Sequence, residues 1–375
     1  MKYLMLKDVC KISMGQSPNS SSYNDNGDGV PFFQGNADFG ERYPITRKWC
    51  NEPTKMANPK DILISVRAPI GAINYAKEEC CIGRGLAALT PDRNKVSPEY
   101  IYWLLKAKNE ELNSKGTGST FKAISRKVLE ETLVPDVDFD KQHEYAKILE
   151  KIYSVIQNRK KELVRFDDFI KARFVEMFGT LNNPSQEFTK ATLKELCNKI
   201  TDGKHGGCKV EEGTERYFVG AREIYDDEVH YDTAPEINVD EFEKDYKRCN
   251  IEIGDFLIVN TGATIGKSAI TTDERTEHTL LQKSVALLKV KKELLNPVFL
   301  KWCYRVNTQM YIVESASAQP NLLLSKINST VIYVPDMELQ NQFADFVTQV
   351  NKSKLPQELC TILQENSLYK LVKVL

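Results

Sequence analysis

Short runs of Ile, Val and Leu, separated by polar segments, recur along the chain and predict β-strands. Four of these runs are the most regular: 61–66, 86–89, 255–260 and 285–288. Polar stretches rich in Gly, Ser and Asn, such as 15–29, are typical of loops. The segment 99–105 follows Pro98 and predicts a short helix, because proline is favoured in the first helical turn. The pattern indicates mixed α/β domains.

A much longer helix is predicted over 141–178, where mostly apolar residues recur at alternating spacings of three and four. This seam comprises Tyr145, Leu149, Ile152, Ile156, Arg159, Leu163, Phe166, Ile170, Arg173 and Met177. Gly179 and Pro184 are expected to end the helix, which would be on the order of 57 Å long at 1.5 Å per residue. Because one helix cannot bury such a stripe alone, the pattern favours a coiled coil with a partner helix.

The second half of the chain repeats the motifs of the first half in the same order, with small gaps. The matched pairs are 6–10 with 193–197, 61–66 with 255–260, Ile70-Gly71 with Ile265-Gly266, 86–89 with 285–288, Pro98 and Trp103 with Pro297 and Trp302, and Val134-Pro135-Asp136 with Val334-Pro335-Asp336. We interpret the chain as a tandem duplication. The duplication supplies the partner helix, whose apolar stripe begins with Leu339, Phe343, Phe346 and Val350.

The second helical arm departs from the first after Val350, where the heptad pattern falters. Pro356 is expected to interrupt the helix, because proline lacks the backbone N–H that an interior position needs. The hypothesis at this stage is that the arm is shortened or broken.

Composition narrows the function only slightly. The 375 residues are 41% hydrophobic and 27% charged, as in ordinary globular proteins, and the length favours more than one domain. The N-terminal segment carries charges among its apolar residues, and no uncharged apolar run is long enough to cross a membrane.

The nine cysteines are never spaced as CxxC, and Cys80 and Cys81 are interpreted as buried hydrophobic residues, so a reducing cytoplasm is expected. The net charge of −1 does not by itself suggest a nucleic-acid partner.

No catalytic set is recognised, and no cofactor or metal is expected. The segment 262–268 imitates a phosphate-binding P-loop, but it has one residue too few between its glycines. A turn that both halves share explains Gly266 better. Asp136, Asp138 and Asp140 imitate a nuclease metal site, and we interpret them as a loop that enters the helix.

Across its full length, the chain resembles the specificity subunits of Type I restriction-modification systems. The resemblance depends on Gly15-Gln16-Ser17-Pro18, on the run 61–71, and on Val134-Pro135 leading through Gln142 into the long helix. It implies an α+β fold with two similar mixed α/β target-recognition domains, each followed by a long helix, and the two helices pairing as an antiparallel coiled coil. The expected parts are target-recognition domain 1 (1–140), the central helix (141–179), target-recognition domain 2 (180–335) and the C-terminal helical arm (336–375).

The resemblance implies a protein without catalytic activity of its own. Each domain would read one half of a bipartite site in double-stranded DNA. The helices would set the distance between the halves and bind two modification (methyltransferase) subunits and the restriction/translocase subunits. Those partners would carry the DNA adenine methyltransferase and ATP-dependent endonuclease activities. The expected helix-interface residues are Leu149, Ile152, Ile156, Leu163, Phe166, Ile170, Phe343, Phe346 and Val350.

Candidate DNA contacts are amide, hydroxyl and basic side chains in the loops and at the strand ends, because such groups bond to base edges or phosphates. In the first domain they are Gln16, Ser17, Gln34, Asn36, Arg67, Arg84, Thr117 and Ser119. In the second domain they are Lys204, His205, Arg222, Lys267, Lys283 and Gln319. Solvated loop positions are the alternative for each residue taken alone.

Three other interpretations stay open: an enzyme whose catalytic motif is not recognisable, a coiled-coil scaffold that does not bind DNA, and a defective or truncated specificity subunit. The polar and basic loops favour nucleic acid over protein as the partner.

Overall fold

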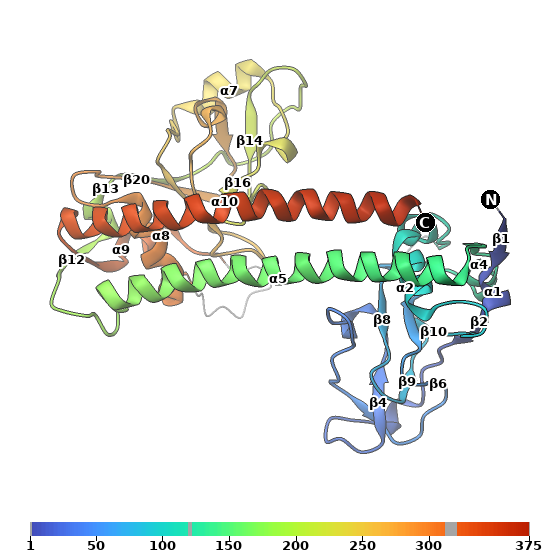
Figure 1. Ribbon diagram of the computed structural model, residues 1–375. Coiled ribbons are helices and arrows are strands. Elements are labelled where there is room, and N and C mark those ends of the chain that lie inside the picture. Colours follow the sequence, from blue (N-terminus) through green and yellow to red (C-terminus); the bar gives the residue numbers. More distant parts are fainter. Residues whose placement is uncertain (1, 119–121, 312–320, 375) are drawn as a thin grey trace. The chain divides into compact units, whose positions relative to one another are not determined.

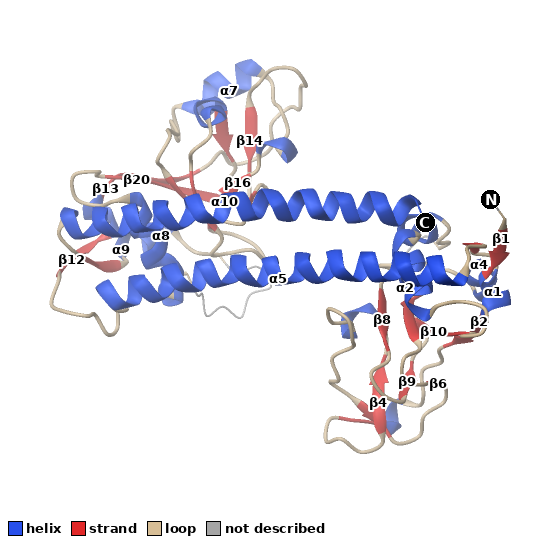
Figure 2. Cartoon of the chain, viewed as in Figure 1, coloured by secondary structure: helices blue, strands red, loops and turns tan. Residues whose placement is uncertain are grey.

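The computed structural model describes residues 2–118, 122–311 and 321–374 (Figure 1). The chain divides into two compact units. Unit 1 comprises Met1–Lys161 and Glu358–Leu375, and unit 2 comprises Glu162–Gln357. Each unit combines strands with helices, as Figure 2 shows, and each has its own hydrophobic core.

Unit 1 is built on a four-stranded antiparallel sheet in the order β2-β10-β7-β8. Its strands are β2 (Cys10–Met14), β7 (Ile62–Ser65), β8 (Ile73–Tyr75) and β10 (Leu86–Pro91). A five-stranded sheet has the order β3-β5-β4-β9-β6, with β3 (Tyr23–Asn24), β4 (Val30–Phe33), β5 (Trp49–Cys50), β6 (Met56–Ala57) and β9 (Cys80–Ile82). A ribbon pairs β1 (Tyr3–Met5) with β11 (Leu133–Pro135). The predicted strands 61–66 and 86–89 are therefore confirmed as neighbours in the first sheet.

Helix α2 (Pro98–Ala107) covers the first sheet of unit 1 and confirms the helix predicted after Pro98. Ser97 caps it, since its hydroxyl accepts a hydrogen bond from the Tyr100 amide at 3.4 Å. Trp103 lies fully buried in the core below. The remaining short helices are α1 (Leu6–Val9), α3 (Asn109–Ser114) and α4 (Arg126–Glu130). Two 3₁₀ turns occupy Ser20–Ser22 and Asn36–Asp38.

Unit 2 has the same arrangement in its main sheet, β13-β20-β17-β18, and in its ribbon, β12-β21. These strands are β12 (Thr189–Thr192), β13 (Cys197–Asp202), β17 (Phe256–Val259), β18 (Ser268–Ile270), β20 (Val285–Val290) and β21 (Val331–Val334). As β4 and β9 do in unit 1, β14 (Tyr217–Val219) and β19 (Thr279–Leu281) pair in parallel. A hairpin joins β15 (Ile224–Tyr225) to β16 (Glu228–Val229).

The helices of unit 2 repeat the pattern, except that one helix is added and a 3₁₀ turn follows α8 where α3 follows α2. They are α6 (Leu193–Leu196), α8 (Pro297–Val306) and α9 (Leu324–Ser329), in the positions of α1, α2 and α4, and α7 (Val239–Tyr246), which is inserted between β16 and β17. Three 3₁₀ turns occupy Tyr231–Thr233, Glu274–His278 and Thr308–Met310. Trp302 is buried on α8 as Trp103 is on α2.

Helix α5 runs from Phe139 to Phe178, and Gly179 follows it with a left-handed φ of 72°. Within unit 1, the seam residues Leu149 and Ile156 are buried. Ile152, Leu163 and Phe166 are half-buried. Toward the end of the helix, within unit 2, the predicted Ile170 is fully buried, but the next fully buried residues are Phe174 and Phe178 rather than the predicted Arg173 and Met177. The heptad spacing was wrong here, because this turn packs on the domain core as well as on α10.

Helix α10 runs from Met337 to Val374 without a break, so the predicted interruption at Pro356 is wrong. Pro356 is exposed, and the helix continues through it. Within unit 2, α10 packs against α5: the rings of Phe174 and Phe343 are 5.3 Å apart, and those of Phe169 and Phe346 are 5.2 Å apart. Val350 is also buried in this core.

Candidate nucleic-acid interface

Three loops of unit 1 meet where β2, β4 and β9 end, and backbone hydrogen bonds join them. The Gly15 amide donates to the Leu86 carbonyl at 2.9 Å, and the Gln16 amide donates to the Ile82 carbonyl at 3.0 Å. The Gly83 amide donates to the Phe33 carbonyl at 2.8 Å. The loop ends therefore form one connected surface instead of three independent loops.

Glycines allow these backbones to touch. A Cβ on Gly15 would lie 2.1 Å from the Gly83 carbonyl oxygen, and one on Gly85 would lie 2.4 Å from the Gln34 carbonyl oxygen. Gln34 and Arg84, the predicted contacts on these loops, are exposed. Glycine on both sides of Arg84 thus presents one guanidinium at the point where the loops cross.

The other predicted residues of unit 1 lie on or beside this surface. Gln16 is exposed, and Ser17 accepts a hydrogen bond from the Arg84 amide at 3.3 Å. Asn36 begins a 3₁₀ turn two residues after Gln34, and the Asp38 carboxylate fixes that turn by accepting from the Gln34 amide at 2.6 Å.

Arg67 and Thr117 join the same surface through a neighbouring strand end. The Val66 amide donates to the Gly85 carbonyl at 2.9 Å, which places the exposed Arg67 next to the loop crossing. Arg67 and Thr117 both form β-bridges with Ala123. Ser119 lies outside the described residues. The adjacent Lys122, which is exposed and whose carbonyl accepts from the Ala68 amide at 3.0 Å, was missed because nothing in its local sequence marks it.

Unit 2 forms the equivalent crossing with the same backbone bonds. The Gly203 amide donates to the Val285 carbonyl at 3.1 Å, the Lys204 amide to the Leu281 carbonyl at 2.7 Å, and the Gln282 amide to the Val219 carbonyl at 2.8 Å. By these bonds Lys204 occupies the position of Gln16, and the exposed Lys283 occupies that of Arg84.

Gln282, which stands at the position of Gly83, was not predicted as a contact. Its amide side chain lies against Gly220, where a Cβ would meet the Gln282 Oε1 at 2.4 Å. Matching Leu280-Leu281 to Cys81-Ile82 in the sequence repeat would have identified this position.

The Lys204 side chain forms ion pairs with two carboxylates of unit 2. Its ammonium lies 2.7 Å from the Asp245 carboxylate and 3.5 Å from Glu241, and both partners belong to α7. Hydrogen bonding to Asp245 raises the pKa of Lys204. His205 is 3.4 Å from Asp202, which also accepts from Arg248. The local sequence could not reveal these ion pairs, because α7 is an insertion without a counterpart in unit 1.

Two further predicted residues of unit 2, Arg222 and Lys267, are exposed and lie in loops. Arg222 follows the loop in which the Ala221 amide donates to the Ser284 hydroxyl at 3.3 Å, which ties this loop to the crossing. Lys267 lies in the turn between β17 and β18. Gln319 lies outside the described residues.

The two segments that imitate a P-loop and a nuclease metal site have structural roles. Gly266 has a φ of 93°, and a Cβ there would lie 2.4 Å from the Tyr311 ring, so this segment is a tight turn packed on an aromatic residue. Asp138 accepts from the Asp140 amide at 3.0 Å at the start of α5, as expected for a loop that enters a helix.

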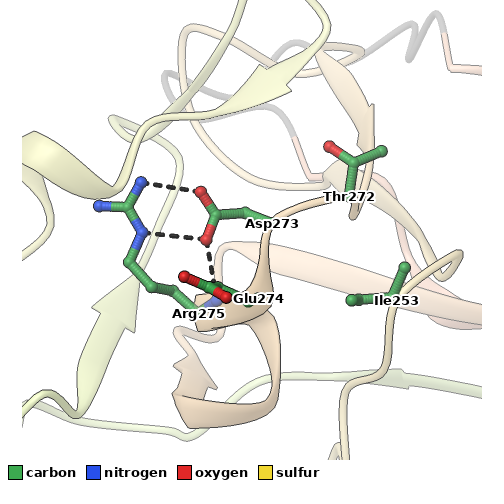
Figure 3. Close-up of a pocket in the computed structure, with 5 residues that line it drawn as sticks. All are labelled: Ile253, Thr272, Asp273, Glu274 and Arg275. Atoms are coloured by element: carbon green, nitrogen blue, oxygen red, sulfur yellow. Dashed lines mark hydrogen bonds and ion pairs between the residues drawn. The ribbon is translucent and has the colours of Figure 1, made fainter.

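A surface pocket in unit 2 is lined by Ile253, Thr272, Asp273, Glu274 and Arg275 (Figure 3). The Arg275 guanidinium bonds to Asp273 at 2.7 and 3.0 Å and to Asp232 at 3.2 Å. These carboxylates raise the pKa of Arg275 and neutralise its charge. None of the predicted DNA contacts that the structure describes is among the residues that line the pocket, and its arginine is paired with two carboxylates.

Within residues 2–118, 122–311 and 321–374, no group of three or more His, Cys, Asp or Glu side chains is arranged to hold a metal ion. Among the same residues no helix has the length and apolarity to cross a membrane. Cys80 and Cys81 are fully buried as predicted, and burial raises the pKa of Cys80 to about 12.

The fold and these loops define a protein of two similar α/β domains that each present a polar loop surface. The family model for the Type I restriction modification DNA specificity domain matches residues 1–165 and 185–361. The chain therefore belongs to the family of Type I restriction-modification specificity subunits.

Among curated relatives, the Type I restriction enzyme EcoBI specificity subunit of Escherichia coli is 21% identical over 384 residues, covering 92% of this chain and 78% of that protein. The MjaIX specificity subunit of Methanocaldococcus jannaschii is 30% identical over 169 residues, covering 42% of this chain and 39% of that protein. The chain thus matches well under half of the archaeal relative's length.

Two solved structures are also similar. The S subunit of the Type I restriction-modification system from M. genitalium aligns over 99% of this chain and 95% of its own, with a TM-score of 0.54 and 15% identity. The HsdS subunit from Thermoanaerobacter tengcongensis is 43% identical over 41% of this chain and 37% of its own, with a TM-score of 0.38. The first of these likenesses supports the mixed α/β fold.

Proposed function

We propose that this chain is the sequence-reading subunit of a Type I restriction-modification complex and that it binds a bipartite site in double-stranded DNA. The observation that carries the proposal is the equivalence of the two loop crossings. Arg84 and Lys283 occupy the same position in two domains of one topology, each exposed beside a glycine-supported backbone crossing. Two such surfaces in one chain suit a site with two halves.

The loop surface of unit 1 is better suited than that of unit 2 to direct hydrogen bonding with bases. Gln16, Gln34 and Arg84 offer amide and guanidinium groups that can form paired hydrogen bonds with adenine or guanine. On the second surface Lys283 is exposed, whereas Lys204 is neutralised by Asp245 and Glu241. Because the side chains differ at equivalent positions, we infer that the two half-sites differ in sequence.

We further propose that residues 1–140 and 180–335 are the two target-recognition domains, duplicated from one ancestor. In this proposal α5 and α10 pair antiparallel along their length as the ruler between them. The ring contacts of Phe174 with Phe343 and of Phe169 with Phe346 support the pairing, since the partners advance in opposite directions along the two helices. Modification and restriction subunits would bind these helices and carry the chemistry, so the chain itself needs neither catalytic residues nor a cofactor. The nine free cysteines fit the cytoplasmic compartment expected for it.

Salt-dependent DNA binding tests this proposal against a scaffold role. The chain, co-purified with its modification subunits, is titrated with labelled duplex DNA between about 50 and about 200 mM salt. Contacts to several phosphates predict an affinity loss of roughly a thousandfold or more across that range. Arg84→Ala and Lys283→Ala should each weaken binding, while Arg126→Ala on α4 should not. An intact complex without salt-sensitive binding would favour the scaffold.

A further inference from the structure

Arg42 of unit 1 connects a loop of the sheet domain to the long helix. It lies in a tight turn, in which the Gly40 amide donates to the Tyr43 carbonyl at 3.2 Å. Its Nη2 lies 2.6 Å from the Glu150 carboxylate on α5. Its main-chain carbonyl accepts from the Tyr75 amide at 2.9 Å, so the same residue is fixed to β8.

The guanidinium of Arg42 is enclosed by aromatic rings from three elements. Its carbon is 4.4 Å from the Tyr102 ring on α2, 5.1 Å from the Tyr75 ring on β8 and 5.9 Å from the Tyr153 ring on α5. Nη1 is buried and has no hydrogen-bond partner in the part of the chain that the structure describes. Ring faces and the Glu150 carboxylate therefore surround it, and a half-buried planar cation held in this way tolerates little rotation.

Unit 2 makes a junction of the same kind with the opposite charge. Asp227, at the tip of the β15–β16 hairpin, has a left-handed φ of 63°. Its carboxylate lies 2.5 Å from Arg305 and 3.4 Å from Lys301, both on α8. Arg305 then reaches Asp167 on α5 at 3.6 Å, and Lys354 on α10 lies 3.2 Å from the other oxygen of Asp167.

Both junctions connect a loop of the sheet domain to α5, and they differ in the sign of the loop residue. In unit 1 a cation of the sheet domain meets a carboxylate of α5 directly. In unit 2 an anion of the hairpin meets α5 through a bridging arginine. Arg305 also stacks 4.5 Å from the Trp302 ring, so this junction too has a cation held on an aromatic face.

We propose that Arg42 with Glu150, and Asp227 with Arg305 and Asp167, are positioning latches that fix the rotation of each recognition domain on its helix. In a protein that reads two half-sites, this rotation decides which base pairs the loops reach. The latches would thus determine how strictly binding depends on the number of base pairs between the two half-sites, which is the spacer length. This effect would be separate from the choice of bases that the loops read. This inference rests on the proposed function.

The test uses the full chain co-expressed with its modification subunit in an unmethylated host, with modified bases mapped across the genome. The variants are Glu150→Gln and Asp227→Asn, which remove one latch charge each and add no bulk. We expect both half-site sequences to stay unchanged. Methylation at sites whose spacer is one base pair longer or shorter should rise at least tenfold over the wild type. Glu150→Asp and Asp227→Glu should largely restore the single spacer.

Glu144→Gln is the matched control, because this exposed carboxylate lies on α5 outside either latch. Its methylation pattern should equal that of the wild type. Spacer stringency that is unchanged in both latch variants would overturn the inference and leave the proposed function standing. Equal loss of methylation at every site, with thermal stability reduced, would also overturn it, because the latches would then be structural only. A wild type that methylates no split motif would count against the proposed function itself.

Discussion

Gln142 in the first turn of α5 accepts a hydrogen bond from the Ser97 amide at 2.9 Å through its side-chain oxygen. Its side-chain nitrogen donates to the Val137 carbonyl at 2.8 Å. Unit 2 repeats the arrangement, as Gln340 accepts from the Asn296 amide at 2.8 Å and donates to the Pro335 carbonyl at 2.7 Å. One amide in each unit thus connects the start of the covering helix to the start of the long helix.

Replacing this amide should destabilise its own unit. Gln142→Ala leaves the buried Ser97 amide and Val137 carbonyl without partners, which is expected to cost about 1–3 kcal/mol. Urea denaturation followed by tryptophan fluorescence measures the effect. His143→Ala, at the next and exposed position, is the control. An equal loss in both variants would mean that the hydrogen bonds of Gln142 contribute nothing specific.

The loop crossing of unit 1 should not accept a side chain at Gly85. Gly85→Ala would place a Cβ 2.4 Å from the Gln34 carbonyl oxygen, so the loops must separate. We expect DNA affinity to fall at least tenfold, measured by fluorescence anisotropy. Gly35→Ala is the matched control, because its backbone is extended and nothing lies within 4 Å of a Cβ there. Wild-type binding by Gly85→Ala would remove the crossing from the DNA interface.

Arg84 should contribute more to binding than Lys204. Arg84→Ala removes an exposed guanidinium and is expected to weaken binding by about 1–3 kcal/mol, roughly five- to 150-fold. Lys204→Ala removes a charge that Asp245 and Glu241 already neutralise, so binding should change less than threefold. Affinities measured at one fixed salt concentration give the comparison. A larger effect at Lys204 would reverse this assignment.

The free energy of unfolding of unit 1 should depend on pH through the protonation of Lys106. Burial, with Arg42 close by, lowers the pKa of Lys106 from its ordinary 10.5 to about 8. Between these values the unfolded chain binds the proton and the folded chain does not, so this group adds stability as pH rises from 8 toward 10.5.

Lys106→Met removes that gain. Between pH 7 and pH 9.5, the Lys106 contribution to the free energy of unfolding should rise by up to about 2 kcal/mol in the wild type. The variant should lack this rise. The buried thiols, whose pKa values are raised, act in the opposite direction above about pH 9 but are common to both proteins. Urea midpoints at the two pH values give the difference, and Lys127→Met on α4 is the control. Parallel pH dependences of Lys106→Met and the wild type would contradict the prediction.

Because α10 continues through Pro356, replacing this proline should stabilise the helix. Proline cannot donate to the Lys352 carbonyl, so Pro356→Ala should restore one helical hydrogen bond and add up to about 3 kcal/mol. Thermal melting should shift upward, whereas Ser353→Ala, at an exposed position one turn earlier, should change it little. An unchanged melt would indicate that the helix is interrupted at this position in solution.

The sequence predicted what depends on local pattern. The helix after Pro98, the strands 61–66 and 255–260, the left-handed end of α5 at Gly179 and the shared turn at Gly266 all follow from residue type and spacing. Loop polarity also identified Arg84 and Lys283 as candidate contacts, although only the backbone bonds of the structure showed that their positions are equivalent.

The rest depended on long-range packing. The neutralisation of Lys204 comes from Asp245, far along the chain in an inserted helix. Arg42 gained its role from rings on three separate elements. The proline rule failed at Pro356 because an exposed position in a long helix tolerates one missing hydrogen bond.

The map of methylated bases in a host that expresses this chain with its modification subunit tests the central claim most directly. The account predicts a single split motif, with two short and different half-sites separated by a fixed gap. Exchanging residues 180–335 for another recognition domain should change only one half. A contiguous motif, or no methylation by an intact complex, would contradict the claim that the two loop surfaces read two halves of one DNA site.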